Sequence, residues 1–176
     1  MEYREATARD VDAIAGLHAD SWRRHYRGAY SDDFLDGDVG AERLAAWTER
    51  LVTKPATDST YTILAERDGV LVGFAHTILD DDPKWGALLD NLHVRHELQG
   101  AGIGTRLLSE TATAVIERTP SAGLYLWVLE QNTAARAFYE ARGGSCVGRG
   151  VAQPPGGGTA AALRYAWRDP AELLVT

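Results

Sequence analysis

A glycine-rich hexapeptide between a strand-like segment and an amphipathic helix constrains this chain more than any other feature. Residues 99–104 read QGAGIG, after an extended apolar segment at 88–94 and before a helix expected to begin near Thr105. The first N–H groups of a helix have no intrahelical acceptor, and the helix dipole adds partial positive charge there. Glycine leaves these groups unshielded and permits positive φ angles. The turn therefore predicts a binding site for an anion such as phosphate or pyrophosphate.

Two nucleotide-binding motifs fit this turn poorly. A Walker loop requires Lys followed by Ser or Thr at the helix start, whereas Gly104 is followed by Thr105 and Arg106. A dinucleotide fingerprint requires two residues between its second and third glycines, and only Ile103 separates Gly102 from Gly104. A phosphate-loop nucleotide module is therefore a weak alternative, beside an ordinary glycine-rich turn without a ligand.

Length and composition favour one compact soluble domain over residues 1–176. With 45% hydrophobic residues, a chain of 176 can bury a substantial core and has little room for a second domain. No segment resembles a transmembrane span or a signal peptide, so we expect a cytoplasmic protein without a membrane partner. The net charge of −7 argues against nucleic-acid binding and weakly favours cationic substrates such as amines. The lone Cys146 is expected to be a small packing residue.

Hydrophobic periodicity predicts an α/β (α+β) fold with a mixed central sheet of about six or seven strands flanked by helices. Strands are expected at 2–6, 61–66, 70–78, 88–94, 124–129, 146–148 and 160–167. Asp68 and Gly69 form a two-residue hairpin turn between the second and third of these strands. Helical patterns are expected at four places. One begins after Asp10, one ends before Pro55, one ends before Pro120 and one ends at Gly143. The aspartates at 80–82 and the PPGGG segment at 154–158 are expected in loops, the latter mobile with nothing to pack.

Two sequence blocks in this order resemble the GNAT superfamily of N-acetyltransferases. Residues 92–94 followed by 99–104 are similar to its pyrophosphate-binding motif, which reads Arg or Gln, two residues, Gly, one residue, and Gly or Ala. Residues 132–140 with Gly143 and Gly144 resemble the family's later helix, with Asn132 and Tyr139 at the usual spacing. The resemblance, sharpest over 88–144, implies a GNAT fold that binds acetyl-CoA at the strand-to-helix glycine loop.

The resemblance also implies which residues contact acetyl-CoA, the co-substrate. Main-chain groups of the strand before the loop would bind the acetyl carbonyl and the pantetheine arm, and the loop amides would hold the pyrophosphate. The expected coenzyme contacts are Leu92, His93, Val94, Gln99, Gly100, Ala101, Gly102, Ile103, Gly104, Thr105, Asn132 and Tyr139. A plain helix N-cap is the alternative for Asn132. No metal is expected.

Tyr139 is the candidate general acid. It follows Asn132 by seven residues, close to two helical turns, so both side chains emerge on nearly the same face. A phenol with an ordinary pKa of ~10 is protonated at neutral pH and can donate to a thiolate as the sulfur leaves. Core packing beside Phe138 is the alternative role.

Asp90 is the candidate general base. Strand alternation would place it on one face with Leu88, Leu92 and Val94, as a carboxylate on an apolar stripe. Burying an unpaired carboxylate is costly, so Asp90 is either functional or paired with an arginine. In the resembling family the commonest glutamate of this strand corresponds to Leu88 here, which leaves the base open. His93 is expected on the opposite face, packed against a helix.

Aromatic residues outside the coenzyme motifs are expected to select the acceptor, a small-molecule or peptide amine. Trp22, Tyr26 and Tyr30 correspond to one wall of the acceptor cleft in the resembling family, and Trp85 precedes the catalytic strand. Aromatic faces can hold a cation or an apolar body, and core packing is the alternative.

The predicted function is acetyl transfer from acetyl-CoA to a primary amine by direct attack in a ternary complex, in a monomer or homodimer. A GNAT-like module that binds acyl-CoA as a sensor or interaction domain without turnover is the alternative. Intact Tyr139 and Asn132 argue against this alternative, and Leu88 in place of the family glutamate leaves it open.

Overall fold

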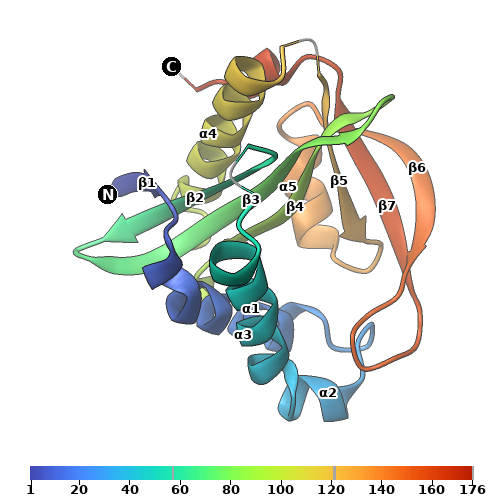
Figure 1. Ribbon diagram of the computed structural model, residues 1–176. Helices are drawn as coiled ribbons and strands as arrows, with labels where there is room; N and C mark the ends of the chain where they lie inside the picture. Colours follow the sequence, from blue (N-terminus) through green and yellow to red (C-terminus); the bar gives the residue numbers. More distant parts are fainter. Residues whose placement is uncertain (57, 121, 176) are drawn as a thin grey trace.

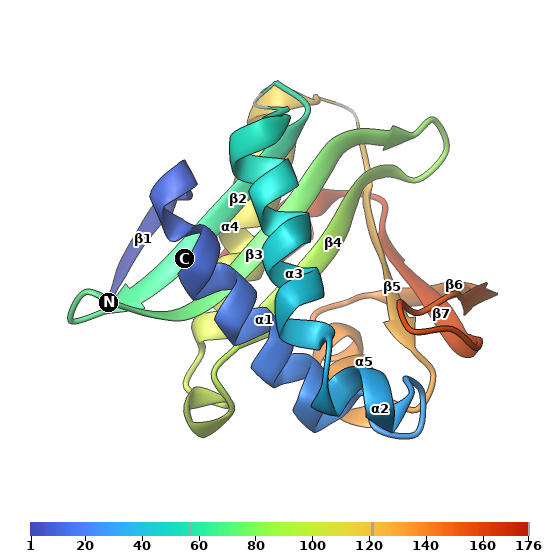
Figure 2. The same ribbon diagram turned by 60° about the horizontal axis from the view of Figure 1, so that its bottom comes forward.

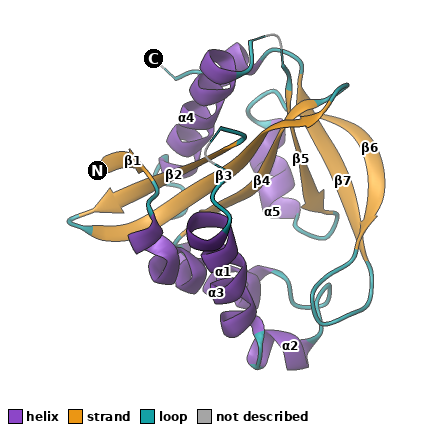
Figure 3. Cartoon of the chain, in the orientation of Figure 1, coloured by secondary structure: helices purple, strands orange, loops and turns teal. Residues whose placement is uncertain are grey.

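The computed structural model, which describes residues 1–56, 58–120 and 122–175, contains a seven-stranded sheet with helices on both faces (Figures 1 and 3). The strands are β1 (Glu2–Glu5), β2 (Thr60–Arg67), β3 (Val70–Asp82), β4 (Gly86–Val94), β5 (Leu124–Leu129), β6 (Ser145–Ala152) and β7 (Ala160–Trp167). Their order across the sheet is β1-β2-β3-β4-β5-β7-β6. Only β4 and β5 are parallel neighbours, and the other pairs are antiparallel. The predicted mixed sheet is therefore confirmed.

Five α-helices and several short turns connect these strands in the described part of the chain. The α-helices are α1 (Val11–His25), α2 (Asp32–Asp36), α3 (Val39–Thr48), α4 (Ile103–Arg118) and α5 (Thr133–Glu140). The short elements are η1 (Ala8–Asp10), η2 (Glu49–Thr53), η3 (His96–Leu98) and η4 (Pro170–Leu173). None of the described helices is both long and apolar enough to cross a membrane.

The two faces of the sheet carry separate apolar clusters. Figure 2 shows α1 and α3 side by side over one face, and α4 covers the other (Figure 1). The apolar stripe of α1, which includes Ile14, packs with Leu64 and Phe74 of the sheet. On the other face, buried residues of α4 such as Leu107 pack with Ala75 and the rest of the largest cluster. This burial of apolar surface on both sides stabilises the sheet that holds the site.

Several local predictions agree with the structure in detail. Asp68 and Gly69 adopt positive φ angles of 54° and 75°, as a tight two-residue hairpin turn requires. Helix α4 starts at Ile103, two residues before the expected position, and ends at Arg118, before Thr119 and Pro120. Proline cannot continue the helix because its ring clashes with the preceding turn.

Three local predictions are wrong. The aspartates at 80–82 belong to β3, because this strand continues along β4 to the turn before Gly86. Cys146 is exposed on β6, an edge strand that has no neighbour on its outer side. The loop at 154–158 packs on α2: Pro154 is buried, and a Cβ added to Gly156 would lie 2.6 Å from the Cβ of Phe34. Proximity to an aromatic ring of α2 holds this loop, a contact that its own composition does not reveal.

A β-bulge in β4 lies close to the point where this strand and β5 part. Opposite β3, the register passes from the pair Thr77–Leu89 to the pair His76–Asn91, so Asp90 is the extra residue. Strand β4 pairs with β5 only at Ala87–Leu124 and Leu88–Tyr125, before the bulge. Beyond it the two strands diverge, and the main-chain groups of β4 that face β5 have no strand partner on that side.

Candidate active site

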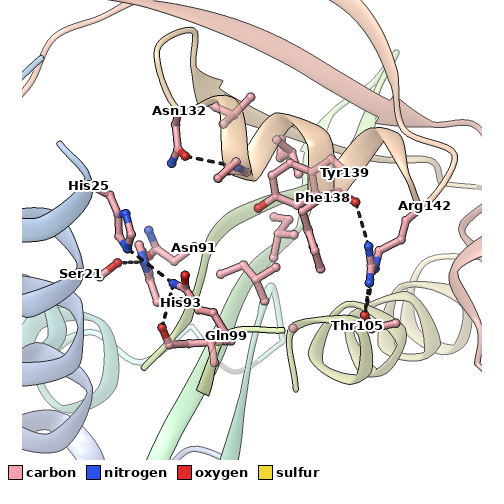
Figure 4. A pocket seen from close by; sticks show the side chains of 18 of the residues that line it. Ser21, His25, Asn91, His93, Gln99, Thr105, Asn132, Phe138, Tyr139 and Arg142 are labelled. Atoms are coloured by element: carbon pink, nitrogen blue, oxygen red, sulfur yellow. Dashed lines mark hydrogen bonds between the residues drawn. The ribbon is translucent and has the colours of Figure 1, made fainter. Parts of the chain in front are cut away.

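The divergence of β4 and β5 opens a cleft of about 410 Å³ that reaches the N-terminus of α4 (Figure 4). Residues of α1, β4, the glycine loop, β5 and α5 form its walls. The predicted site residues that line it are Tyr26, Asp90, Leu92, His93, Val94, Gln99, Gly100, Gly102, Gly104, Thr105, Asn132 and Tyr139. The predicted residues outside the lining are Trp22, Tyr30, Trp85, Ala101 and Ile103.

The glycine loop has the backbone geometry of an anion site. Gly100 and Gly102 adopt left-handed φ angles of 83° and 82°, and Gly102 is the N-cap of α4. The N–H of Arg106 donates to the Gly102 carbonyl at 3.0 Å, so the amides before it precede the regular helical bonds. A Cβ at Gly100 or Gly102 would meet no atom within 4 Å. Glycine therefore serves the backbone conformation here and leaves open space in front of the amides.

Gly104 has a different role because it lies where α4 approaches α5. A Cβ at this position would lie 3.3 Å from Cζ of Phe138, closer than ordinary van der Waals contact. The third glycine of the motif thus allows the two helices that border the cleft to approach each other.

Two further side chains near the loop were missed by the sequence reasoning. The Arg142 guanidinium donates from Nε to Thr105 Oγ1 at 3.0 Å and lies 4.0 Å from the centre of the Phe138 ring. His25, the last residue of α1, approaches Gln99, with 3.5 Å between the two Nε2 atoms. Burial lowers the pKa of His25. Arg142 lies in the turn just after α5, three residues past Tyr139, a closeness that could have indicated it, whereas no motif signals His25.

Tyr139 and Asn132 both line the cleft from α5, as their spacing predicts (Figure 4). The Tyr139 ring packs edge-on against Phe138 and Trp167, with ring centres 5.2 Å and 6.1 Å apart. Burial raises the pKa of the Tyr139 phenol, which therefore stays protonated at neutral pH. Asn132 caps α5 by accepting a hydrogen bond from Ala135 N at 3.2 Å. The N-cap role is thus present, and the amide nitrogen of Asn132 is not used by this bond.

The predicted alternation of β4 is wrong beyond Asp90, because a bulge places two consecutive side chains on one face. Asp90 and Asn91 both point to η2, where Arg50 donates to Asp90 Oδ2 at 2.8 Å and to Asn91 Oδ1 at 2.9 Å. Leu92 and Val94 lie on the opposite face, packed on the cluster of α4. Asp90 is therefore no isolated carboxylate on an apolar stripe. It lines the cleft with an arginine partner, each side chain about one-third exposed.

His93 packs against α1 and is held in a neutral state. Its Nδ1 lies 2.8 Å from the Ser21 hydroxyl oxygen, and its ring lies 4.5 Å from that of His18. Burial lowers the pKa of His93 to about 3. Such an imidazole is a weak base at neutral pH, so His93 is a poor candidate for deprotonating an amine. Ser21, which lines the cleft beside it, was not singled out from the sequence.

The predicted acceptor wall is only partly in the cleft. Tyr26 lines it and stacks on Trp22, with ring centres 5.5 Å apart. Trp22 is buried beneath Tyr26, with the Arg43 guanidinium 4.1 Å from its ring centre. Tyr30 packs edge-on against both rings, and burial raises its pKa to about 12. Trp22 and Tyr30 therefore support Tyr26 from behind.

Trp85 lies away from these three rings, in the turn between β3 and β4. Its ring is flanked by Lys84, whose Nζ lies 4.7 Å from the ring centre, and by Arg164, at 5.1 Å. The long β3–β4 hairpin carries this turn beyond the residues that line the cleft.

Comparisons with known proteins agree with this geometry. The model of the acetyltransferase (GNAT) family matches residues 19–144. A probable N-acetyltransferase of Mycobacterium tuberculosis is 29% identical over 141 residues, which are 80% of this chain and 77% of that protein. The structure of PaiA N-acetyltransferase from Thermoplasma acidophilum with coenzyme A is similar, with a TM-score of 0.67 and 20% identity, covering 94% of this chain and 98% of that one.

A further solved structure, yncA of Salmonella typhimurium with its cofactor acetyl-CoA, has a TM-score of 0.68 and 17% identity, covering 95% of this chain and 92% of that one. At these identities the solved structures establish the fold. The family match covers more than half of the chain and includes both sequence blocks that border the cleft. The chain belongs to the GNAT family and is an acyltransferase of the N-acetyltransferase type.

Proposed function

We propose that this protein transfers an acetyl group from acetyl-CoA to a primary amine by direct attack within a ternary complex. The observation that carries this proposal is one continuous cleft that joins the glycine loop at α4 to the gap between β4 and β5, with the Tyr139 ring on its wall. Coenzyme A in PaiA and acetyl-CoA in yncA, proteins with the same fold, support the choice of co-substrate.

The coenzyme would occupy the cleft along its length. The free amides at the start of α4 suit its pyrophosphate, because N–H groups and the helix dipole both favour an anion there. Arg142, hydrogen-bonded to Thr105 of the first turn, adds a positive charge at the same end. The pantetheine arm can hydrogen-bond to the main chain of β4 where β5 has turned away. Its thioester would then lie near Tyr139.

The reaction requires one bond to form and one to break. The neutral amine attacks the thioester carbonyl, the C–N bond forms, and the C–S bond breaks to release the coenzyme thiolate. Tyr139 donates a hydrogen bond to the departing sulfur and relays to it the second proton that the nitrogen loses. A thiol has an ordinary pKa of ~8.5, and burial raises the pKa of Tyr139 further above the ordinary phenol value of ~10. The phenol therefore regains a proton from the nitrogen as it gives its own to the sulfur, and it ends the reaction protonated.

Asp90 is proposed to take the first proton from the incoming ammonium, directly or through water. Its carboxylate lines the cleft, and Arg50 holds it in place at 2.8 Å. Tyr26 borders the same part of the cleft and would contact the acceptor. Asn132 would contact the coenzyme through the amide nitrogen that its capping bond leaves free.

A panel of primary amines with acetyl-CoA tests this proposal. Released thiol and N-acetylated product, identified by mass spectrometry, should appear in equal amounts with at least one amine. The enzyme incubated with acetyl-CoA alone should carry no acetyl adduct. Binding of acetyl-CoA without turnover across the panel would instead support a non-catalytic acyl-CoA module, and an acetylated enzyme that passes its acetyl group to amines would exclude direct attack.

A further inference from the structure

Arg164 lies within a cluster of aromatic rings beside the cleft. On β7 it pairs across the sheet with Trp127 of β5, and Trp127 lines the cleft. Its guanidinium carbon lies 4.4 Å from the ring centre of Trp127, 5.1 Å from that of Trp85 and 5.4 Å from that of Tyr125. Three aromatic neighbours restrict the guanidinium, because cation–π contacts favour its place over the rings. The result is a positioned cation next to Trp127 of the cleft wall, while Arg164 itself is outside the cleft lining.

Arg164 forms no ion pair in the described part of the chain, although its charge, after the backbone hydrogen bonds of Trp85 and Lys84, helps to lower the pKa of Asp82. No carboxylate among these residues pairs with it, and its Nε is buried without a hydrogen-bond acceptor. On the adjacent strand β6, by contrast, Arg149 pairs with Glu130. A buried N–H group without an acceptor costs on the order of 1–3 kcal/mol. Such a group is rare in folded proteins and calls for an explanation.

The carboxylates of the nearby β3–β4 hairpin make their hydrogen bonds to groups other than Arg164. Asp81 accepts a hydrogen bond from the Tyr125 hydroxyl. Asp82 Oδ1 accepts the backbone amides of Lys84 and Trp85 at 2.8 Å and 2.9 Å. Both carboxylates therefore have partners other than Arg164, and Lys84 adds a second cation on the same turn. An anion from outside the chain could satisfy the Arg164 guanidinium.

The position of Arg164 relates it to the proposed acetyl acceptor. The pair Leu88–Tyr125 joins β4 to β5, and two residues further along these strands lie Asp90 and Trp127, with Arg164 next to Trp127 on β7. Paired strands lie ~5 Å apart, which holds for β5 and β7 at Trp127 and Arg164. Strand β4 has left β5 at Asp90, so the backbones of Asp90 and Arg164 lie further apart than the ~10 Å that three paired strands would span. A molecule with its amine near Asp90 would reach Arg164 by spanning the gap between β4 and β5, toward which the long arginine side chain can extend.

We infer that the acceptor is an amine that also carries an anionic group, and that Arg164 binds this group. A carboxylate suits the site best, since the planar guanidinium fork matches it with two parallel hydrogen bonds. This inference rests on the proposed function and specifies its substrate class. Free amino acids, carboxyl-terminated peptides and aminoalkyl phosphates share the required chemistry.

Matched pairs of acceptors test the inference. The kcat/KM of the wild type is measured with β-alanine and β-alanine amide, with short peptides ending in a carboxylate or an amide, and with phosphoethanolamine and ethanolamine. The anionic member of at least one pair should be the better substrate. Arg164→Met should lower kcat/KM for that member by about 10²-fold, which corresponds to ~2.8 kcal/mol, and should change the neutral member by less than ~3-fold.

Two variants and one binding measurement complete the test. Arg149→Met removes an arginine from the neighbouring strand and should leave both members unchanged, whereas Arg164→Lys should retain part of the preference. Melting temperature and acetyl-CoA affinity show whether each variant is folded. If the Arg164 variants do not fold, inhibition of the wild type by propionate and by propionamide replaces them, and propionate should be the stronger inhibitor.

The outcomes separate this inference from the proposed function. Equal loss of activity for anionic and neutral acceptors in Arg164→Met would overturn the inference, as would a wild-type preference for the neutral members of every pair. Turnover of neutral amines would leave the proposed function intact in both cases. Failure to acetylate any amine, with acetyl-CoA bound, would refute the proposed function itself.

Discussion

Gly102 provides the sharpest test of the proposed coenzyme site, because an added Cβ there would meet no protein atom within 4 Å and would face the proposed ligand. Gly102 has φ 82°, and an added Cβ has no neighbour within 4 Å. Replacing it with Asp puts a carboxylate in front of the amides that open α4. Any bound pyrophosphate would then face a negative charge at the positive end of this helix.

The expected loss of affinity follows from charge and distance. Two unit charges ~5 Å apart repel by about 3 kcal/mol at an effective dielectric constant of ~20. This energy corresponds to a loss of acetyl-CoA affinity of at least ~10²-fold. The left-handed backbone adds a strain on the order of 1 kcal/mol for a non-glycine residue, which lowers stability and not affinity.

Two control variants separate charge from strain. Gly102→Asn has nearly the same shape without the charge, and its loss of affinity should be at least tenfold smaller than that of Gly102→Asp. Gly69→Asp introduces the same residue at φ 75°, also with open space around the Cβ, in the β2–β3 hairpin turn outside the cleft. It should lower the melting temperature to a similar extent without affecting coenzyme binding.

Isothermal titration with acetyl-CoA measures all three affinities, and thermal denaturation measures the three stabilities. The reasoning is falsified if folded Gly102→Asp binds acetyl-CoA as tightly as the wild type. Equal losses in Gly102→Asp and Gly102→Asn would show that shape, and not the anion site, determines the affinity.

Three further predictions concern individual side chains. Tyr139→Phe keeps the ring and removes the donor, so kcat should fall by roughly 10²-fold with acetyl-CoA affinity unchanged; a wild-type kcat would assign Tyr139 to packing. Asp90→Asn should lower kcat/KM most near neutral pH, with partial rescue at higher pH where more amine is neutral. Arg50→Met breaks the ion pair between Arg50 and Asp90. If Asp90→Asn and Arg50→Met lower the melting temperature equally, and both keep a pH–rate profile parallel to that of the wild type, Asp90 has a structural role only. Because burial lowers the pKa of His93 to about 3, below its unfolded value of ~6.5, its contribution to stability is complete above pH ~6.5 and is lost as the pH falls toward 3. His93→Gln should therefore reduce the decrease in melting temperature between pH 6.5 and 4.5, and an unchanged decrease would contradict a buried neutral imidazole.

Local sequence signals were sufficient for most of the secondary structure. The hairpin at Asp68 and Gly69 follows from the positive φ angles that its turn type requires, and the end of α4 follows from Pro120. Predictions failed where a distant segment decides the outcome. The loop at 154–158 is polar and glycine-rich, yet it packs because Phe34, more than a hundred residues earlier, lies against Gly156.

The part of the cleft proposed to bind the coenzyme could be predicted from the sequence, and the part proposed to bind the acceptor could not. Amides of one loop and side chains of one helix form the first half, so spacing along the sequence places Gly102, Asn132 and Tyr139 correctly around the cleft. The second half is assembled from α1, β5 and β7, whose relative positions depend on tertiary packing. Trp127 and Arg164 come together only because β7 lies beside β5 in the sheet.

The bulge at Asp90 explains the failed prediction for β4 and lies where the cleft begins. Strict alternation assumes two residues for every pleat, and one extra residue reverses the faces of all residues that follow. Here the reversal brings Asp90 and Asn91 together under Arg50, while Leu92 and Val94 pack toward α4. The same irregularity coincides with the end of pairing to β5, where main-chain groups become available to a ligand. In a perfectly regular β4, Asp90 and Asn91 would lie on opposite faces of the sheet, and Arg50 could not hold both side chains.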